Sequence, residues 1–208
     1  MLNQKIPTMN KRVTLKFISV IFVIFFPQHI NACQPKHDLS FQYCLITTPE
    51  IFDASHDLIN TSWDEEGFTR SNVSWSGGFY GTFRYFFTDI QSIDAVFGYN
   101  RTYGDLMLGD EKQGESIRDF CTIGVEWSIH YIRKEYFQMY SGGGLGATFV
   151  FEDNSFYQAG ERSYSDSRVY PNFDFTFVGF RVGRRIAGFA ELGFGYKGFL
   201  AFGCSAQF

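Results

Sequence analysis

Four side chains with catalytic potential lie close together in the sequence, at Asp53, Ser55, His56 and Asp57. Serine, histidine and an acid form the hydrolase triad, in which the histidine takes the serine proton and the acid orients the imidazole. Triads are assembled by the fold from distant parts of a chain, however, and a serine beside a histidine is common in polar loops. We therefore expect no catalytic residue and interpret the protein as non-enzymatic.

A glycine-rich segment, Ser141 to Gly146, superficially resembles a phosphate-binding loop. Such a loop would continue into a lysine, a serine or threonine, and a helix. Here apolar and polar residues instead keep alternating through Phe149. Glycines on a strand that faces a crowded interior explain the segment better, so we expect no cofactor.

The four cysteines, at positions 33, 44, 121 and 204, lack the spacing of metal ligands. Cys33 and Cys44 could form a disulfide in an oxidising compartment, but four unpaired small apolar residues are the simpler interpretation. We predict no metal site. The net charge of -4 gives no indication of nucleic-acid binding.

The first 32 residues have the features of a signal peptide. Basic residues precede an apolar run from Phe17 to Phe26, which is too short to cross a bilayer as a helix. Cleavage after Ala32 is our preferred prediction, and acylation of Cys33 as a lipoprotein is the alternative. The exported domain would then comprise residues 33–208.

Beyond Asp38 apolar and polar residues alternate with the period of β-strands. The clearest segment runs from Cys121 to Tyr131, where every second residue is apolar or aromatic. A change of phase near Phe177 to Gly179 predicts a β-bulge. Eight strands are expected, at residues 38–45, 73–87, 90–103, 121–131, 136–151, 172–183, 189–196 and 200–208.

The connections between these strands alternate between long and short. Long polar loops are predicted at residues 47–71, 104–117 and 152–171, the first with a short helical turn near Ile51 to Leu58. Turns of a few residues follow the second, fourth and sixth strands, and Tyr196 to Gly198 make a short last connection. An even number of antiparallel strands with this asymmetry predicts an all-β fold, an eight-stranded antiparallel transmembrane up-and-down β-barrel.

The polar faces of these strands carry an unusual number of charges. In a narrow eight-stranded barrel such groups would face the lumen, where opposite charges can pair and side chains fill the interior. Arg84 and Arg181 would lie near Glu126 and Glu191. We interpret the cluster as a structural plug and keep a narrow channel as the alternative. The predicted lumenal residues are Arg84, Asp94, Glu126, His130, Asp174, Arg181 and Glu191.

The run from Trp75 to Phe208 resembles a known family. The resemblance is clearest in three segments: Gly179 to Gly183, Phe189 to Tyr196, and the last strand, which ends on the aromatic Phe208. They are similar to the small outer-membrane β-barrel proteins of Gram-negative bacteria. The resemblance implies a place in the cell outer membrane, contact with its lipid, and recognition of Phe208 as an insertion signal by the barrel assembly machinery. It brings no catalytic residue with it.

The leading hypothesis is a structural or surface-interaction protein that contacts an unknown extracellular partner through loops 47–71, 104–117 and 152–171. One alternative is an outer-membrane enzyme acting on lipid or peptide. Another is a soluble exported sandwich or lipid-binding barrel. The last would place its aromatic side chains inside and its charges outside, the reverse of a membrane barrel.

Overall fold

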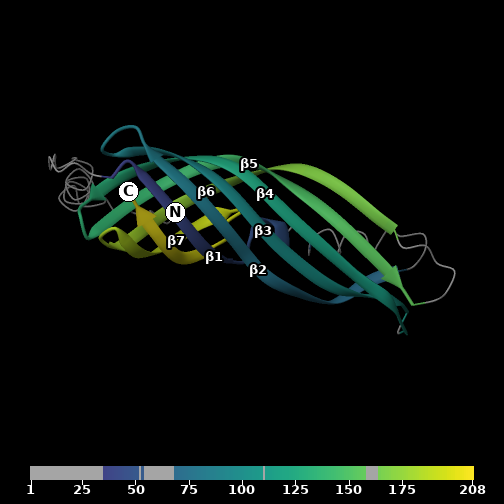
Figure 1. Ribbon diagram of the computed structural model, residues 1–208. Coiled ribbons are helices and arrows are strands. Elements are labelled where there is room, and N and C mark those ends of the chain that lie inside the picture. The colour runs from purple at the N-terminus through teal and green to yellow at the C-terminus, as the bar shows by residue number, and fades with distance from the viewer. Residues whose placement is uncertain (1–34, 52, 54–67, 110, 158–163) are drawn as a thin grey trace, which may run out of the picture.

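Eight antiparallel strands form one closed barrel in the computed structural model, which describes residues 35–51, 53, 68–109, 111–157 and 164–208. Each strand pairs with the next in sequence, and β1 pairs with β8 to close the sheet (Figure 1). The predicted fold class is confirmed. The strands are β1 (His37–Leu45), β2 (Phe68–Phe86), β3 (Gln91–Leu108), β4 (Glu111–Arg133), β5 (Phe137–Phe156), β6 (Tyr164–Gly183), β7 (Ile186–Gly195) and β8 (Leu200–Gln207).

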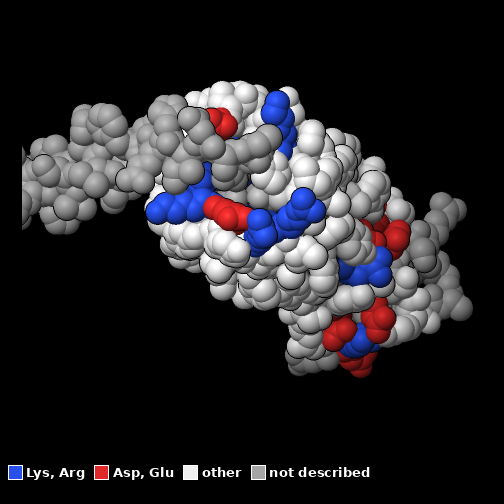
Figure 2. Space-filling model, turned by 60° about the vertical axis from the view of Figure 1, so that its left-hand side comes forward, with Lys and Arg blue, Asp and Glu red and all other residues white. Residues whose placement is uncertain are grey.

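The outer surface of the barrel carries an apolar band. In β4 the band extends from Cys121 to Tyr131, with Val125 56% and Trp127 50% exposed at its centre. The residues between them, such as Glu126 and Ser128, are buried in the lumen. Figure 2 shows a broad surface without charged residues between two charged ends. This polarity is the reverse of that expected for a soluble lipid-binding barrel.

Five of the strands are much longer than the other three. β2 to β6 contain 18 to 23 residues, whereas β1, β7 and β8 contain 9, 10 and 8. The long strands continue past the short ones at one end of the barrel (Figure 1). We call these extensions the arms, which comprise residues 68–77, 101–108, 111–119, 151–156 and 164–168.

The arms correct the predicted loops. Only residues 109 and 110 separate β3 from β4, so the loop predicted at 104–117 is almost entirely strand. β2 begins at Phe68, and β5 and β6 extend to Phe156 and from Tyr164, inside the other two predicted loops. The prediction failed because both faces of an arm lie outside the apolar band and carry polar residues. Hydrophobic alternation disappears there, although the backbone pairing persists.

The predicted bulge in β6 is confirmed. Along β7, Thr176 pairs with Gly193 and Val178 pairs with Leu192, so Phe177 is an extra residue without a counterpart. The neighbouring strand shows the same shift, because Tyr140 pairs with Gly179 and Gly142 with Thr176. The inserted residue keeps the apolar side chains on both sides of it directed outward.

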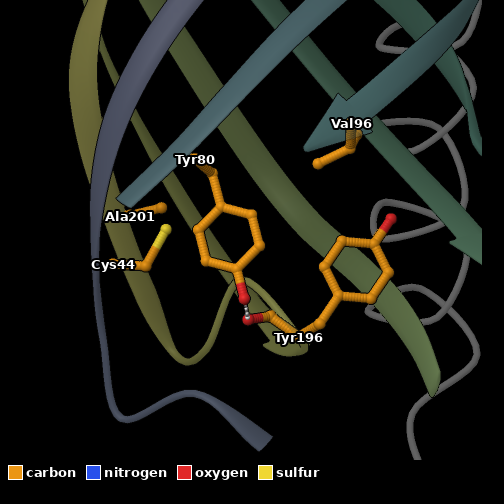
Figure 3. Packing of buried hydrophobic residues seen from close by; sticks show 5 residues of the cluster. All are labelled: Cys44, Tyr80, Val96, Tyr196 and Ala201. Carbon is orange, nitrogen blue, oxygen red and sulfur yellow. Dashed lines mark hydrogen bonds between the residues drawn. The ribbon is translucent and has the colours of Figure 1, made fainter. Parts of the chain in front are cut away.

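Three lumenal tyrosine rings lie directly against glycines of other strands. A Cβ atom at Gly98 would lie 2.0 Å from the Tyr80 ring, one at Gly179 2.5 Å from the Tyr140 ring, and one at Gly124 2.6 Å from the Tyr196 hydroxyl. Figure 3 shows Tyr80 and Tyr196 inside the barrel with the small side chains packed near them. Glycine at these inward positions therefore makes room for the rings.

We predict that Val125→Arg destabilises the folded protein by about 2–4 kcal/mol, because Val125 lies at the middle of the apolar band. The matched control is Ile117→Arg, an outward position of the same strand in the arms. It should cost much less, because water can solvate the guanidinium there. The measurement is reversible denaturant unfolding in lipid vesicles. Equal costs at the two positions would contradict the band.

Candidate functional site

A buried lysine is the centre of the lumenal charge network. The Lys197 ammonium lies 2.8 Å from a Glu126 oxygen, 3.0 Å from Glu191 and 3.5 Å from Asp174. Its side chain is only 5% exposed. The sequence interpretation correctly places Tyr196 to Gly198 in a short turn. It groups Tyr196 with the outward residues of the seventh strand and does not count Lys197 among the lumenal charges, and the structure corrects both points. β7 ends at Gly195, whose φ of 151° turns the chain so that the next two side chains point inward.

Tyrosine hydroxyls complete this network. Tyr196 donates a hydrogen bond of 2.7 Å to Glu126, and Tyr140 donates one of 2.6 Å to Glu191. The Tyr80 hydroxyl donates to the Tyr196 carbonyl at 2.6 Å (Figure 3). The carboxylates thus have both an ionic partner and a hydrogen-bond donor, which is the condition for tolerating charges in a poorly hydrated interior.

A second group of charges lies below the first, toward the short turns. Arg84 donates to Asp94 at 2.8 Å, and Arg181 lies 3.3 Å from Asp38. These partners differ from Glu126 and Glu191, which the sequence interpretation placed near the two arginines and which instead bind Lys197. Ser92 and Ser128 also donate to the oxygens of Asp94, at 3.0 and 3.2 Å.

His130 is fully buried in this lower group. Its ring stacks on Tyr140 and meets Phe86 edge-on, with both pairs of centroids 4.8 Å apart. All seven predicted lumenal residues are therefore buried within the barrel, in two groups joined through Tyr140, which donates to Glu191 and lies under the Arg84 guanidinium.

A third group closes the end of the barrel that carries the arms. Asp53 accepts hydrogen bonds from Arg70 at 2.7 Å and from Arg118, and Arg118 also reaches Glu152 at 3.1 Å. The sequence interpretation missed these pairs because it assigned Asp53, Arg70 and Glu152 to loops and began the fourth strand only at Cys121, after Arg118. Both Asp53 oxygens thus accept from arginines. Residues 55–57, which complete the cluster considered as a hydrolase triad and judged non-catalytic, lie outside the described residues.

The segment that brings Asp53 into the barrel starts with a capped helical turn. Thr47 donates its backbone N–H to the Glu50 carboxylate at 2.9 Å, and the N–H of Ile51 donates to the Thr47 carbonyl at 3.1 Å. The bond from Thr47 to Glu50 is one of the two bonds of a capping box. The turn starts at residue 48, earlier than predicted, and the rest of the predicted helix lies among residues that are not described.

The arginines set the charge state of the third group. Burial by itself would raise the pKa of Asp53, but Arg118 and Arg70 hold this pKa below its ordinary value. Burial would likewise raise the pKa of Glu152, and Arg118 is the main cause that lowers it. Both carboxylates are therefore ionised at neutral pH, and their charge depends on the arginines.

The lumen contains a small polar cavity between the first two groups. It measures about 10 Å³, which is room for roughly one water molecule. Polar side chains, including Arg84, Tyr140, Arg181 and Glu191, form most of its wall. The charged side chains therefore leave little space at this level of the lumen.

The cysteines and possible metal ligands form no further site among the described residues. Cys44 is a fully buried free thiol, and Cys121 and Cys204 are free thiols on the outward face. Cys33, and with it the alternative disulfide, lies outside the described residues. In the described part of the chain no group of three or more histidines, cysteines and acids is arranged to hold a metal ion. No helix there is long and apolar enough to span a membrane.

A polar lumen, an apolar outer band and eight up-and-down strands define the class as a transmembrane β-barrel. No family model matches the chain, and no curated protein sequence matches it. Among solved structures it is similar to Ail, the attachment invasion locus protein of Yersinia pestis, at 14% identity and a TM-score of 0.43 over 84% of this chain and 97% of Ail. It is also similar to Ail in complex with the heparin analogue sucrose octasulfate, at 13% identity and a TM-score of 0.45 over 83% of this chain and 98% of Ail.

Lys197→Met should destabilise the barrel by about 3–5 kcal/mol, because three buried carboxylates lose their common cation. Adding Glu126→Gln to this variant should recover part of the loss, since one uncompensated charge is removed. Unfolding in detergent micelles, measured for both single variants and the double variant, tests the coupling. Strictly additive effects would show that the two side chains do not interact.

Lowering the pH should release the helical turn from the barrel. Because the pKa values of Asp53 and Glu152 are lowered on folding, their stabilisation is complete above the unfolded-state pKa of about 4 and is lost as pH falls through the folded values. Hydrogen exchange at residues 47–53, corrected for intrinsic rates, should lose protection between about pH 5 and pH 3. Asp53→Asn should remove the protection at both pH values, and unchanged protection in wild type would contradict the assignment.

Proposed function

We propose that the protein is an outer-membrane β-barrel that contacts extracellular partners through its arms. The apolar band of β4, from Cys121 to Tyr131, has the length of a strand that crosses a bilayer, about 9–11 residues. A polar lumen inside an apolar surface is the arrangement of transmembrane barrels. The arms then project from the membrane.

The arms are the observation that carries the interaction role. Nine residues of β4, 111–119, extend beyond the band, which corresponds to about 30 Å of strand. Among the described residues, the first β2 residue paired with β1 is Gly78, and the first β6 residue paired with β7 is Asp174. Within the part of the chain that the structure describes, no further strand pairs with the outer edges of β2 and β6 in the arms. Such edges can add a strand from another chain.

One backbone N–H of β6 lies on this outer edge. The Ser167 N–H donates to the Asp166 side chain at 2.8 Å, so it is directed away from β5. The outer face of the arms also presents three exposed aromatic or aliphatic anchors, at Trp75, Tyr103 and Phe151. Edge hydrogen bonds with aromatic anchors suit an extended peptide segment of a protein partner.

The channel and enzyme alternatives receive less support. Paired charges occupy the lumen, and its cavity holds about one water molecule, which favours a plug over a conducting pore. Asp53, an acid of the cluster considered as a hydrolase triad, is bound by Arg70 and Arg118. Export by the signal peptide at residues 1–32 and recognition of Phe208 by the barrel assembly machinery remain parts of this proposal.

Adhesion by a Gram-negative host that produces the protein tests this function. The host should adhere to a basement-membrane extract several-fold better than the same host without the protein. Ser167→Pro, which removes an edge N–H, and Tyr103→Ser with Phe151→Ser should each abolish most of the gain. Lys134→Gln, at the opposite end of the barrel, is the matched control.

Each variant must first show the wild-type amount of heat-modifiable protein in the outer-membrane fraction. Absence of the wild-type protein from that fraction would refute the membrane location. Normal location without any gain in adhesion to the extract would contradict a role in matrix contact. Full adhesion by both arm variants would move the contact away from the arms.

A further inference from the structure

The end of the barrel opposite the arms carries a collar of basic residues. It comprises four exposed side chains, Lys36, Lys134, Arg184 and Arg185, which we call the basic collar. Among the described residues this end has only two exposed acids, Asp89 and Glu135. The arms, by contrast, contain seven acidic and five basic residues. Among the described residues, only this end therefore has an excess of basic side chains, and Figure 2 shows Lys and Arg gathered there.

Two inner arginines hold the backbone of the collar in place. Arg181 donates from the lumen to the carbonyl oxygens of Arg184 at 3.1 Å and Arg185 at 3.2 Å, so these carbonyls face inward and their side chains face outward. Arg133 donates to the carbonyls of Asp89 and Pro35. These hydrogen bonds thus fix the backbone that carries the basic side chains of the collar.

The collar has few internal partners. Glu135 pairs with Arg184. Lys36, Lys134 and Arg185 form no ion pair with any residue that the structure describes. Three cations of the rim are therefore available to an external anion.

The neighbours of these cations indicate what that anion is. Arg185 directly precedes Ile186, which is 79% exposed, and Lys134 lies two residues before the exposed Tyr136. The basic side chains therefore lie where the apolar band ends. In a bilayer this is the level of the headgroup phosphates, and basic residues beside an apolar surface bind anionic lipid there.

We propose that the basic collar binds the phosphate groups of anionic phospholipids in the leaflet at the short-turn end. The proposal rests on the proposed membrane location. Each basic residue near an anionic membrane surface contributes about fivefold in affinity. The collar thus selects anionic lipids and fixes the depth of the barrel at this leaflet, while the arms remain free on the other side.

Lipid selection can be measured directly. The protein is reconstituted into nanodiscs with equal amounts of phosphatidylglycerol and phosphatidylcholine, and the lipids that stay bound after release are counted by native mass spectrometry. Wild type should retain phosphatidylglycerol several-fold over phosphatidylcholine, with a smaller preference at high salt. The triple variant Lys36→Gln, Lys134→Gln, Arg185→Gln should lose the preference, and Lys134→Gln alone should reduce it.

Lys112→Gln, in the arms, is the matched control and should keep the wild-type preference. Equal retention of the two lipids by wild type, or an unchanged preference in the triple variant, would overturn the collar while leaving the membrane location intact. Loss of the preference in Lys112→Gln would place lipid selection in the arms and would also overturn it. Failure of wild type to enter nanodiscs of either lipid would refute the membrane location itself.

Discussion

The pairing of buried charges is the constraint on which this structure depends. A closed barrel of eight strands has an interior that side chains just fill, so every charge in the lumen is separated from bulk water. Such a charge needs a partner inside the lumen, and Lys197 is the partner of three carboxylates, from β4, β6 and β7. Because removal of one partner exposes the others to an uncompensated desolvation cost, these strands are held in one register.

The polarity of the two faces of the sheet changes along the barrel axis. Within the band, the sheet separates a polar lumen from an apolar surroundings, and its residues alternate strictly. Beyond the band, polar and charged residues lie on both faces of the arms beside a few exposed aromatic rings, and ion pairs such as Arg101 with Asp119 appear on the outer side. At the opposite rim, the basic collar replaces the apolar side chains. The proposed contacts with the bilayer, with a partner and with lipid headgroups thus fall in three zones along the barrel axis.

The sequence predicts the faces of the band well, since alternation is informative where the two sides of a sheet meet different media. It therefore located all seven lumenal residues and the extra residue at Phe177. The arms were mistaken for loops, because backbone pairing leaves no hydrophobic signal where both faces meet water. Lys197 was missed because strand parity ends at Gly195, where the chain turns. One signal was available: the predicted lumen held four carboxylates and only two arginines, which indicates a missing cation.

The membrane location of the band is the central claim, and Trp127 reports on it directly. A variant that keeps Trp127 as its sole tryptophan, with Trp63 and Trp75 replaced by phenylalanine, is folded into vesicles that contain lipids brominated along their acyl chains. The account predicts strong quenching of Trp127 fluorescence by the brominated lipids and little quenching by aqueous iodide. Quenching by iodide with no effect of the brominated lipids would show that the apolar band does not face a bilayer.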